Sequence, residues 1–299
     1  MILRLLISVC LLLFYLNINA QVSTQDNVVG SLYTIPSKTL NAEKEIKVFL
    51  PASYVESETA YPVLYILDGQ RYFLHGVSLQ QTFIDFKQTP EFIIVGINRH
   101  PSERNRNYSV NAQQYLEFIE NEVVAFIDKE FRTTSERMLF GWAFGGGFVI
   151  ESLISNPELF DGYIAASPFP LSARIEKLDS FFISNPNLDR SLYFSSGAEG
   201  ASVTEGTEKL DSLLQSSAPT SMTWHFQSLA DEEHRSTPFT TLYHGIKSYF
   251  SHYPELQFNS LADFNQAGGL DFVNDYYQQR AVKYGFAKEL SDWTMFSIT

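Results

Sequence analysis

Short apolar runs alternate with stretches of helical periodicity along most of the chain. Runs such as VLYIL, apolar at every position, are typical of strands buried on both faces of a sheet. Runs of this kind predict strands at 45–51, 62–68, 91–97, 137–142, 162–168, 191–197 and 222–228. The spacing of apolar positions predicts helices at 113–131, 144–157, 205–215 and 237–250. This alternation indicates an α/β fold, with a mostly parallel central sheet and helices on both faces.

The composition shifts near residue 255, which separates an α/β domain at 21–254 from a helical C-terminal extension at 255–299. Helices are predicted there at roughly 259–267, 270–284 and 288–299. The last residues carry no capping or stop signal. Two interpretations stay open: a natural C-terminal helix pair, or the start of a helical-repeat module that continues beyond the given sequence.

The first twenty residues have the pattern of a signal peptide. Arg4 supplies a basic start, an apolar run follows, and small and polar residues lead to Ala20. The run is shorter than the ~20 residues that span a bilayer. We therefore expect export to the periplasm or the medium, with cleavage after Ala20 and no integral membrane segment afterwards. An uncleaved anchor helix is the alternative. Cys10, the single cysteine, lies in this segment, so the mature chain has no thiol chemistry.

Acidic residues outnumber basic ones by 34 to 21, for a formal net charge of −13. Loss of Arg4 with the signal peptide would make the mature chain one charge more negative. This balance argues against nucleic acid and against anionic membrane surfaces as partners.

A glycine-rich segment, Gly141-Trp142-Ala143-Phe144-Gly145-Gly146-Gly147, joins a predicted strand to a predicted helix. This is the context of a nucleophile elbow. The turn is tight, so small residues are expected two positions before and after its tip, where Gly141 and Gly145 stand. The tip is normally a serine at positive φ; here it is Ala143.

Other interpretations of this segment are weaker. A phosphate loop would need Lys followed by Ser or Thr, and Phe148-Val149 stands there instead. A dinucleotide fingerprint near the first strand of a βαβ unit is absent from the sequence. A purely structural glycine-rich turn remains the alternative.

Two backbone groups are candidates for an oxyanion hole. In α/β-hydrolases one donor follows the nucleophile and the other comes from an earlier strand-end loop. The candidates are the N–H groups of Phe144 and of Gln70, which follows the run Leu67-Asp68-Gly69. Backbone donors do not depend on the side chain at position 143.

His234 stands between the last predicted strand and the helix at 237–250, where the general base of such a fold belongs. A surface-loop histidine is the alternative. Glu199, directly after the strand at 191–197, is preferred to Glu205 as the acid that orients it, although a solvated carboxylate would occupy the same position. No histidine shows metal-ligand spacing, so no metal is expected.

These segments resemble the putative-esterase family of α/β-hydrolases, which includes siderophore esterases, feruloyl esterases, the esterase D group and the mycolyltransferases. The resemblance rests on residues 61–73, 136–168 and 231–250 and covers roughly 30–253. It implies ester hydrolysis by serine, histidine and an acid, without a cofactor. Those roles transfer to His234, Glu199, Gln70 and Phe144, but no nucleophile transfers to Ala143.

Three hypotheses explain Ala143: a deliberate replacement of serine, a natural pseudoenzyme that binds a ligand or partner, or chemistry by another group, such as a water activated by His234. Alanine at a positive-φ tip costs on the order of 1–2 kcal/mol. Since the other parts remain, this favours recent or deliberate loss. A purely structural α/β domain is a further alternative.

The expected ligand is a small-molecule or glycan-linked ester. Arg99 and Trp142 are candidate substrate contacts, with solvation of the arginine and packing of the tryptophan as their alternatives.

Overall fold

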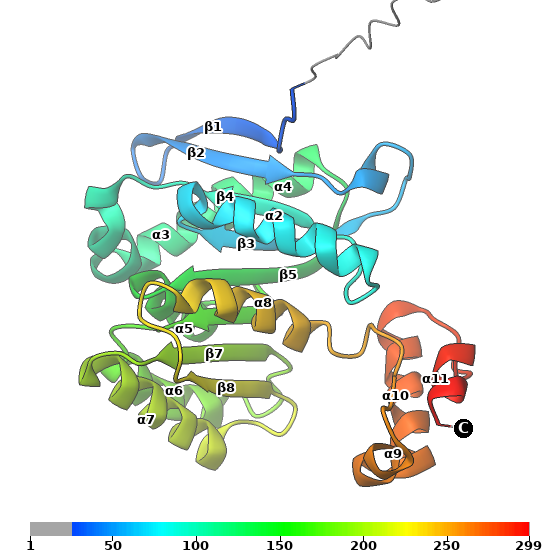
Figure 1. Ribbon diagram of the computed structural model, residues 1–299. Coiled ribbons are helices and arrows are strands. Elements are labelled where there is room, and N and C mark those ends of the chain that lie inside the picture. Colours follow the sequence, from blue (N-terminus) through cyan, green and yellow to red (C-terminus); the bar gives the residue numbers. More distant parts are fainter. Residues whose placement is uncertain (1–25, 299) are drawn as a thin grey trace, which may run out of the picture.

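The computed structural model describes residues 26–298, so the predicted signal peptide lies outside the described residues. Within that range the strands form one eight-stranded sheet in the order β1-β2-β4-β3-β5-β6-β7-β8 (Figure 1). The strands are β1 (Ser31–Ser37), β2 (Ala42–Phe49), β3 (Tyr61–Leu67), β4 (Ile93–Ile97), β5 (Thr133–Trp142), β6 (Gly162–Ala166), β7 (Ser191–Gly197) and β8 (Thr223–Leu229).

The sheet is antiparallel only where β1, β2 and β4 meet, and the other neighbouring strands pair in parallel. The predicted α/β-hydrolase fold, with a mostly parallel sheet, is confirmed. All seven predicted strands are present; the additional strand is β1. Only Ile35 and Ser37 of β1 are buried. Its polar positions and Pro36 therefore left little of the apolar signal that marks the central strands.

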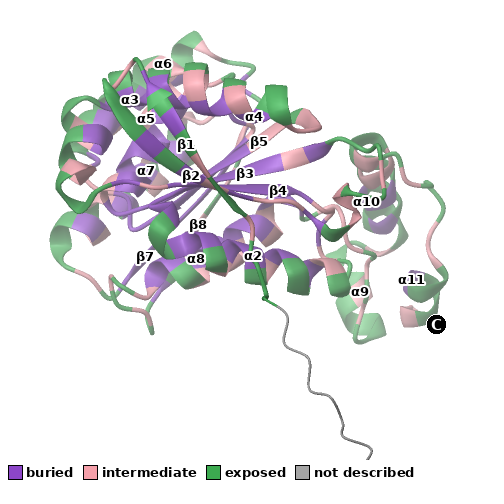
Figure 2. Cartoon of the chain, turned by 90° about the horizontal axis from the view of Figure 1, so that it is seen from above, coloured by how far each residue is buried: buried purple, intermediate pink, exposed green. Residues whose placement is uncertain are grey.

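Helices cover both faces of the sheet (Figure 2). The helices are α2 (Gly69–Asp85), α3 (Ala112–Phe118), α4 (Ala125–Glu130), α5 (Phe144–Ser155), α6 (Ser172–Ser184), α7 (Ala201–Ser217) and α8 (Thr237–Tyr249). The sequence did not predict α2 and α6. The predicted helix at 113–131 is divided by a π-helical segment, η4 (Ile119–Val124), between α3 and α4. Three shorter segments are η1 (Ala52–Tyr54), η2 (Pro101–Glu103) and the π-helical η3 (Arg106–Val110).

Strand β3 shows how the two layers are built. Val63, Tyr65 and Leu67 belong to the core beneath α3–α7, whereas Leu64 and Ile66 belong to the core beneath α2 and α8. Successive side chains of a strand point to opposite faces, so a run that is apolar throughout fills both cores.

The C-terminal extension forms three helices, α9 (Leu261–Ala267), α10 (Gly269–Tyr284) and α11 (Asp292–Ser297), around a small core of its own. It lies near the end of the sheet where the parallel strands begin, away from their carboxyl ends (Figure 1). The hydroxyl of Tyr276 donates to the carbonyls of Ser251 and Pro254, and Arg280 donates to that of Tyr253. None of the helices within residues 26–298 is long and apolar enough to cross a membrane.

Candidate active site

Three of the five non-glycine residues with positive φ in the described part of the chain lie at the carboxyl ends of neighbouring strands. Asp68, Ala143 and Ser167 have φ values of 56°, 53° and 43°. They directly follow β3, β5 and β6, which are neighbours in the sheet. Positive φ is unfavourable for residues with a Cβ and persists where the surrounding structure enforces it, which is often at functional sites. These three strand ends therefore mark the candidate site.

Ala143 stands at the tip of the turn between β5 and α5, with φ 53° and ψ −114°. Its N–H donates to the carbonyl of Ala166 at 2.9 Å, and its own carbonyl accepts from Gly147 and Phe169. Phe144 is the first residue of α5, so its N–H has no acceptor within the helix. The turn has the strand–turn–helix geometry predicted for a nucleophile elbow.

The glycines around the tip differ in whether a Cβ would fit at their positions. A Cβ on Gly141 would lie 2.4 Å from the carbonyl oxygen of Gly145, so position 141 must be glycine. A Cβ on Gly145 would have its nearest neighbour, a ring carbon of Tyr108, at 3.6 Å, an ordinary contact. Position 145 thus has room for alanine, which is itself small, so glycine is not required there. On the helical side, Gly146 and Gly147 cannot bear a Cβ, which would lie 2.7 Å from the carbonyl oxygen of Ala166 and 2.5 Å from that of Phe169.

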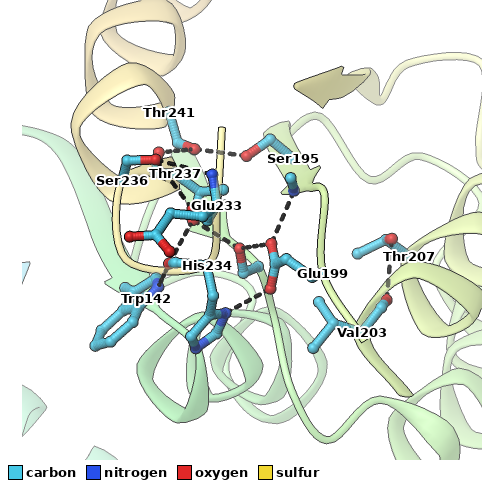
Figure 3. Close-up of polar contacts among 12 residues, drawn as sticks. Trp142, Ser195, Glu199, Val203, Thr207, Glu233, His234, Ser236, Thr237 and Thr241 are labelled. Atoms are coloured by element: carbon cyan, nitrogen blue, oxygen red, sulfur yellow. Dashed lines mark hydrogen bonds and ion pairs between the residues drawn. The ribbon is translucent and has the colours of Figure 1, made fainter. Parts of the chain in front are cut away.

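His234 and Glu199 lie together in the loops that follow β8 and β7 (Figure 3). Oε2 of Glu199 contacts Nδ1 of His234, and Oε1 accepts from the N–H of Gly197 at 2.8 Å. Burial raises the pKa of Glu199, but hydrogen bonds from His234, Ser167 and Gly197 outweigh it and hold the pKa below the usual range of a carboxyl. Glu205 lines a separate pocket on α7, so the geometry favours Glu199.

Trp142 connects the elbow to the histidine loop. Its indole Nε1 donates to the carbonyl oxygen of His234 at 2.8 Å, and the two ring centroids lie 4.8 Å apart. The residue is 7% exposed and does not line the pocket beside Ala143. The geometry therefore assigns Trp142 a packing role rather than the predicted substrate contact.

The two arginines of the loop after β4 have different surroundings. The guanidinium of Arg99 is buried in an ion pair with Asp68, whose side chain is 1% exposed. Arg99 lines the pocket next to Gln70 and not the one beside Ala143, so its predicted substrate contact stays a prediction. Arg104 lies 3.8 Å from the other oxygen of Asp68, stacks 4.4 Å from the ring of Trp142 and donates to the Trp142 carbonyl. The sequence alone did not indicate that Arg99 is enclosed in an ion pair whereas Arg104 lines the pocket beside Ala143.

A pocket of about 260 Å³ opens beside the elbow. Its lining consists of Arg104, Ala143, Phe144, Phe169, Ser202, Val203 and His234. The structure thus brings the elbow tip, one predicted oxyanion donor and the predicted base to one cavity. Gln70, the other predicted donor, lines an adjacent pocket with Arg99 and His100, and its side chain accepts from the N–H of Arg99.

No cluster of three or more His, Cys, Asp or Glu residues in the described part of the chain is arranged to hold a metal ion. The groups at the pocket are a histidine–carboxylate pair, an arginine and a helix N-terminus, which suit acyl-group chemistry once a nucleophile is supplied.

The model of the Esterase family, described as "Putative esterase", matches residues 37–255. The chain belongs to this esterase family. The match includes the elbow, the Glu199–His234 pair and all strands from β2 to β8, whereas α9–α11 lie beyond it.

Among relatives of this chain, the ferri-bacillibactin esterase of Bacillus subtilis is 26% identical over 137 residues, which are 36% of this chain and 47% of the relative. The siderophore triacetylfusarinine C esterase of Aspergillus fumigatus is 25% identical over 146 residues, or 41% and 50% of the two chains. The chain thus spans about half the length of the curated relatives it matches.

Solved structures show the same fold. An IroE-like serine hydrolase from Shewanella oneidensis superimposes with a TM-score of 0.73 at 24% identity, over 86% of this chain and 88% of that chain. The BES protein from Bacillus cereus gives a TM-score of 0.68 at 23% identity, over 77% and 98%.

Proposed function

We propose that this chain is an exported carboxylic-ester hydrolase scaffold of the serine-esterase type, in which Ala143 occupies the position of the nucleophilic serine. One observation carries the proposal: Ala143, at the strained tip before α5, lines the same pocket as His234, whose Nδ1 faces Glu199. Export rests on the signal-peptide pattern of residues 1–20.

With a serine at position 143, the remaining groups support acyl transfer. The hydroxyl oxygen would attack the ester carbonyl while His234 takes its proton, and His234 would return the proton to the departing alkoxide. Glu199 would orient the imidazole and stabilise its charged form. The N–H of Phe144, with Gln70 as the predicted second donor, would stabilise the oxyanion. Water would then release the acid by the same route.

With alanine at position 143, the chain has no side-chain oxygen there with which to form an acyl-enzyme. Oxyanion stabilisation and binding alone leave roughly 10³–10⁴-fold over the uncatalysed rate when such a nucleophile is lost. We therefore propose that the protein binds an ester and turns it over at a residual rate at most.

The substrate proposed is a small-molecule ester or a glycan-linked ester. The names of two relatives, a ferri-bacillibactin esterase and a triacetylfusarinine C esterase, make siderophore esters the first class to test. The pocket wall supports a ligand with both apolar and anionic parts, because Phe144 and Phe169 face it together with Arg104.

The test is to introduce Ala143→Ser and measure hydrolysis of p-nitrophenyl acetate and of a panel of siderophore and sugar esters. The matched control is the double variant Ala143→Ser/His234→Gln. The proposal expects hydrolysis that appears with the serine and disappears with the histidine. If Ala143→Ser produced no increase in ester hydrolysis, the proposal would be rejected.

A second candidate is a natural binding protein that uses the same pocket, and Ala143 itself is the observation that favours it. Tight binding of an ester by the chain as written, without turnover after Ala143→Ser, would support this candidate over the esterase.

A further inference from the structure

Buried hydroxyl groups lie beside Oε1 of Glu199, the carboxylate oxygen that does not contact the imidazole of His234. Ser167, at the end of β6, and Thr237, at the start of α8, are both fully buried. Oγ of Ser167 donates to Oε1 of Glu199 at 2.5 Å and lies 2.7 Å from Oγ1 of Thr237. Oγ1 of Thr237 also lies 3.1 Å from the carbonyl oxygen of His234.

The direction of these hydrogen bonds follows from their chemistry. A carboxylate only accepts, so the hydroxyl of Ser167 donates its one proton to Glu199. In the contact with Thr237 the threonine must therefore be the donor. The Thr237 proton is shared between Oγ of Ser167 and the carbonyl of His234. The hydroxyls thus form a directed chain that begins at Thr237, the first residue of α8, and ends on the carboxylate of Glu199.

The two carboxylate oxygens of Glu199 consequently bind different donors. Oε1 accepts from the hydroxyl of Ser167 and from the N–H of Gly197, whereas Oε2 contacts Nδ1 of His234. Two donors on one oxygen hold the plane of the carboxylate. Rotation that would carry Oε2 away from the imidazole would break both of these bonds.

Ser167 holds its hydroxyl in place at a cost in backbone energy. Its φ is 43°, a region that glycine adopts freely and that serine rarely adopts. Its N–H donates to the carbonyl of Ser195 at 2.8 Å, which continues the pairing of β6 with β7. Nothing in that backbone bond requires a hydroxyl, so the serine side chain needs a separate explanation, and its contact with Glu199 supplies one.

We propose that Ser167, supported by Thr237, is a positioning residue that fixes Oε1 of Glu199 so that Oε2 faces Nδ1 of His234. Only the kinetic test of this inference rests on the proposed function. The contacts of Glu199 that it explains are already present in the Ala143 protein.

The first experiment uses the Ala143 protein itself. Proton NMR measures the downfield resonance of the His234 Nδ1–H that is hydrogen-bonded to Glu199. Ser167→Ala and Ser167→Gly should each shift or abolish it, and so should Thr237→Val, whereas Thr237→Ser should preserve it. Ser167→Gly relieves the positive φ, so it separates loss of the hydroxyl from a change in backbone strain.

Ser195→Ala is the matched control. Ser195 is as buried as Ser167 and also bonds a threonine of α8, Thr241, but it does not contact Glu199. Its removal should leave the resonance in place. An unchanged resonance in both Ser167 variants, or an equal loss in Ser195→Ala, would overturn the proposal.

A kinetic experiment in the Ala143→Ser background separates this proposal from the proposed function. Ser167→Ala and Ser167→Gly should lower kcat by about tenfold, as for loss of one hydrogen bond to a charged group, with KM unchanged. An active Ala143→Ser enzyme that is unaffected by both Ser167 variants would overturn the positioning role. An inactive Ala143→Ser enzyme would count against the proposed function, and the NMR result would then decide the positioning role.

Discussion

The indole Nε1 of Trp142 donates a 2.8 Å hydrogen bond to the backbone carbonyl of His234, 92 positions further along the chain. Trp142 is the last residue of β5 and directly precedes the elbow tip, so this bond ties the histidine loop to the turn that carries Ala143. The position of the histidine is thus set from two sides, by Trp142 on its backbone and by Glu199 on its ring.

Trp142→Phe should destabilise the protein by about 1 kcal/mol through loss of this bond, since a phenyl ring retains most of the packing. Urea unfolding monitored by circular dichroism measures the change. Trp224→Phe is the control, because Trp224 packs against the core but its indole makes no hydrogen bond within residues 26–298. Equal effects of the two substitutions would contradict the role assigned to the Trp142 bond.

The elbow glycines give a matched pair of predictions. Gly141→Ala should cost about 2–3 kcal/mol, because its Cβ would lie 2.4 Å from the Gly145 carbonyl oxygen. Gly145→Ala should leave stability unchanged or raise it by about 0.5 kcal/mol, since its Cβ has room and alanine is the better helix former. Thermal unfolding of both variants is the measurement. A large loss of stability in Gly145→Ala would contradict the space found beside this position.

Asp68→Asn tests the buried charge cluster. Asparagine tolerates the positive φ of this position as well as aspartate does, so only the charge changes. The guanidinium of Arg99, 2% exposed, would lose its ion-pair partner, and we expect a loss of about 3 kcal/mol in urea unfolding. The control is Glu130→Gln in the exposed pair with Lys129, which should change little. Similar effects of the two variants would contradict the stabilising role of the Asp68–Arg99 pair.

Glu199 should make stability depend on pH in a defined direction. Hydrogen bonds from His234, Ser167 and Gly197 hold its pKa in the folded chain below the ordinary range of a glutamate carboxyl. A depressed folded pKa contributes stability above the unfolded pKa, and that contribution is lost as pH falls through the folded pKa. The stability advantage of the parent over Glu199→Gln should therefore be full at neutral pH and shrink below about pH 4. An advantage that does not change with pH would rule out the charge of Glu199 as its source.

The candidate site was predictable where a single strand end identifies a residue. Ala143, Glu199 and His234 each follow an apolar run, and the carboxyl ends of parallel strands meet at one edge. The antiparallel edge strand β1 was harder to predict, because one face is solvated and its apolar signal is weak.

Contacts between distant segments were not predictable from the same patterns. Ser167 and Thr237 meet across 70 positions, and their pairing depends on how α8 packs on the sheet. Arg99 and Arg104 look equivalent in the sequence. Only the buried carboxylate of Asp68 decides that the first is enclosed in an ion pair and the second reaches the pocket. Ser167 did carry one local signal, as a polar residue at the end of an apolar run.

The central claim is that the site lacks one hydroxyl and is otherwise assembled. Intact mass spectrometry after treatment with a fluorophosphonate tests it most directly, because such a reagent modifies serines activated by a neighbouring base. The Ala143→Ser protein should gain a single adduct that maps to position 143. The parent chain should gain none, and Ala143→Ser/His234→Gln should react far more slowly. Absence of the adduct, or labelling that does not depend on His234, would contradict the account.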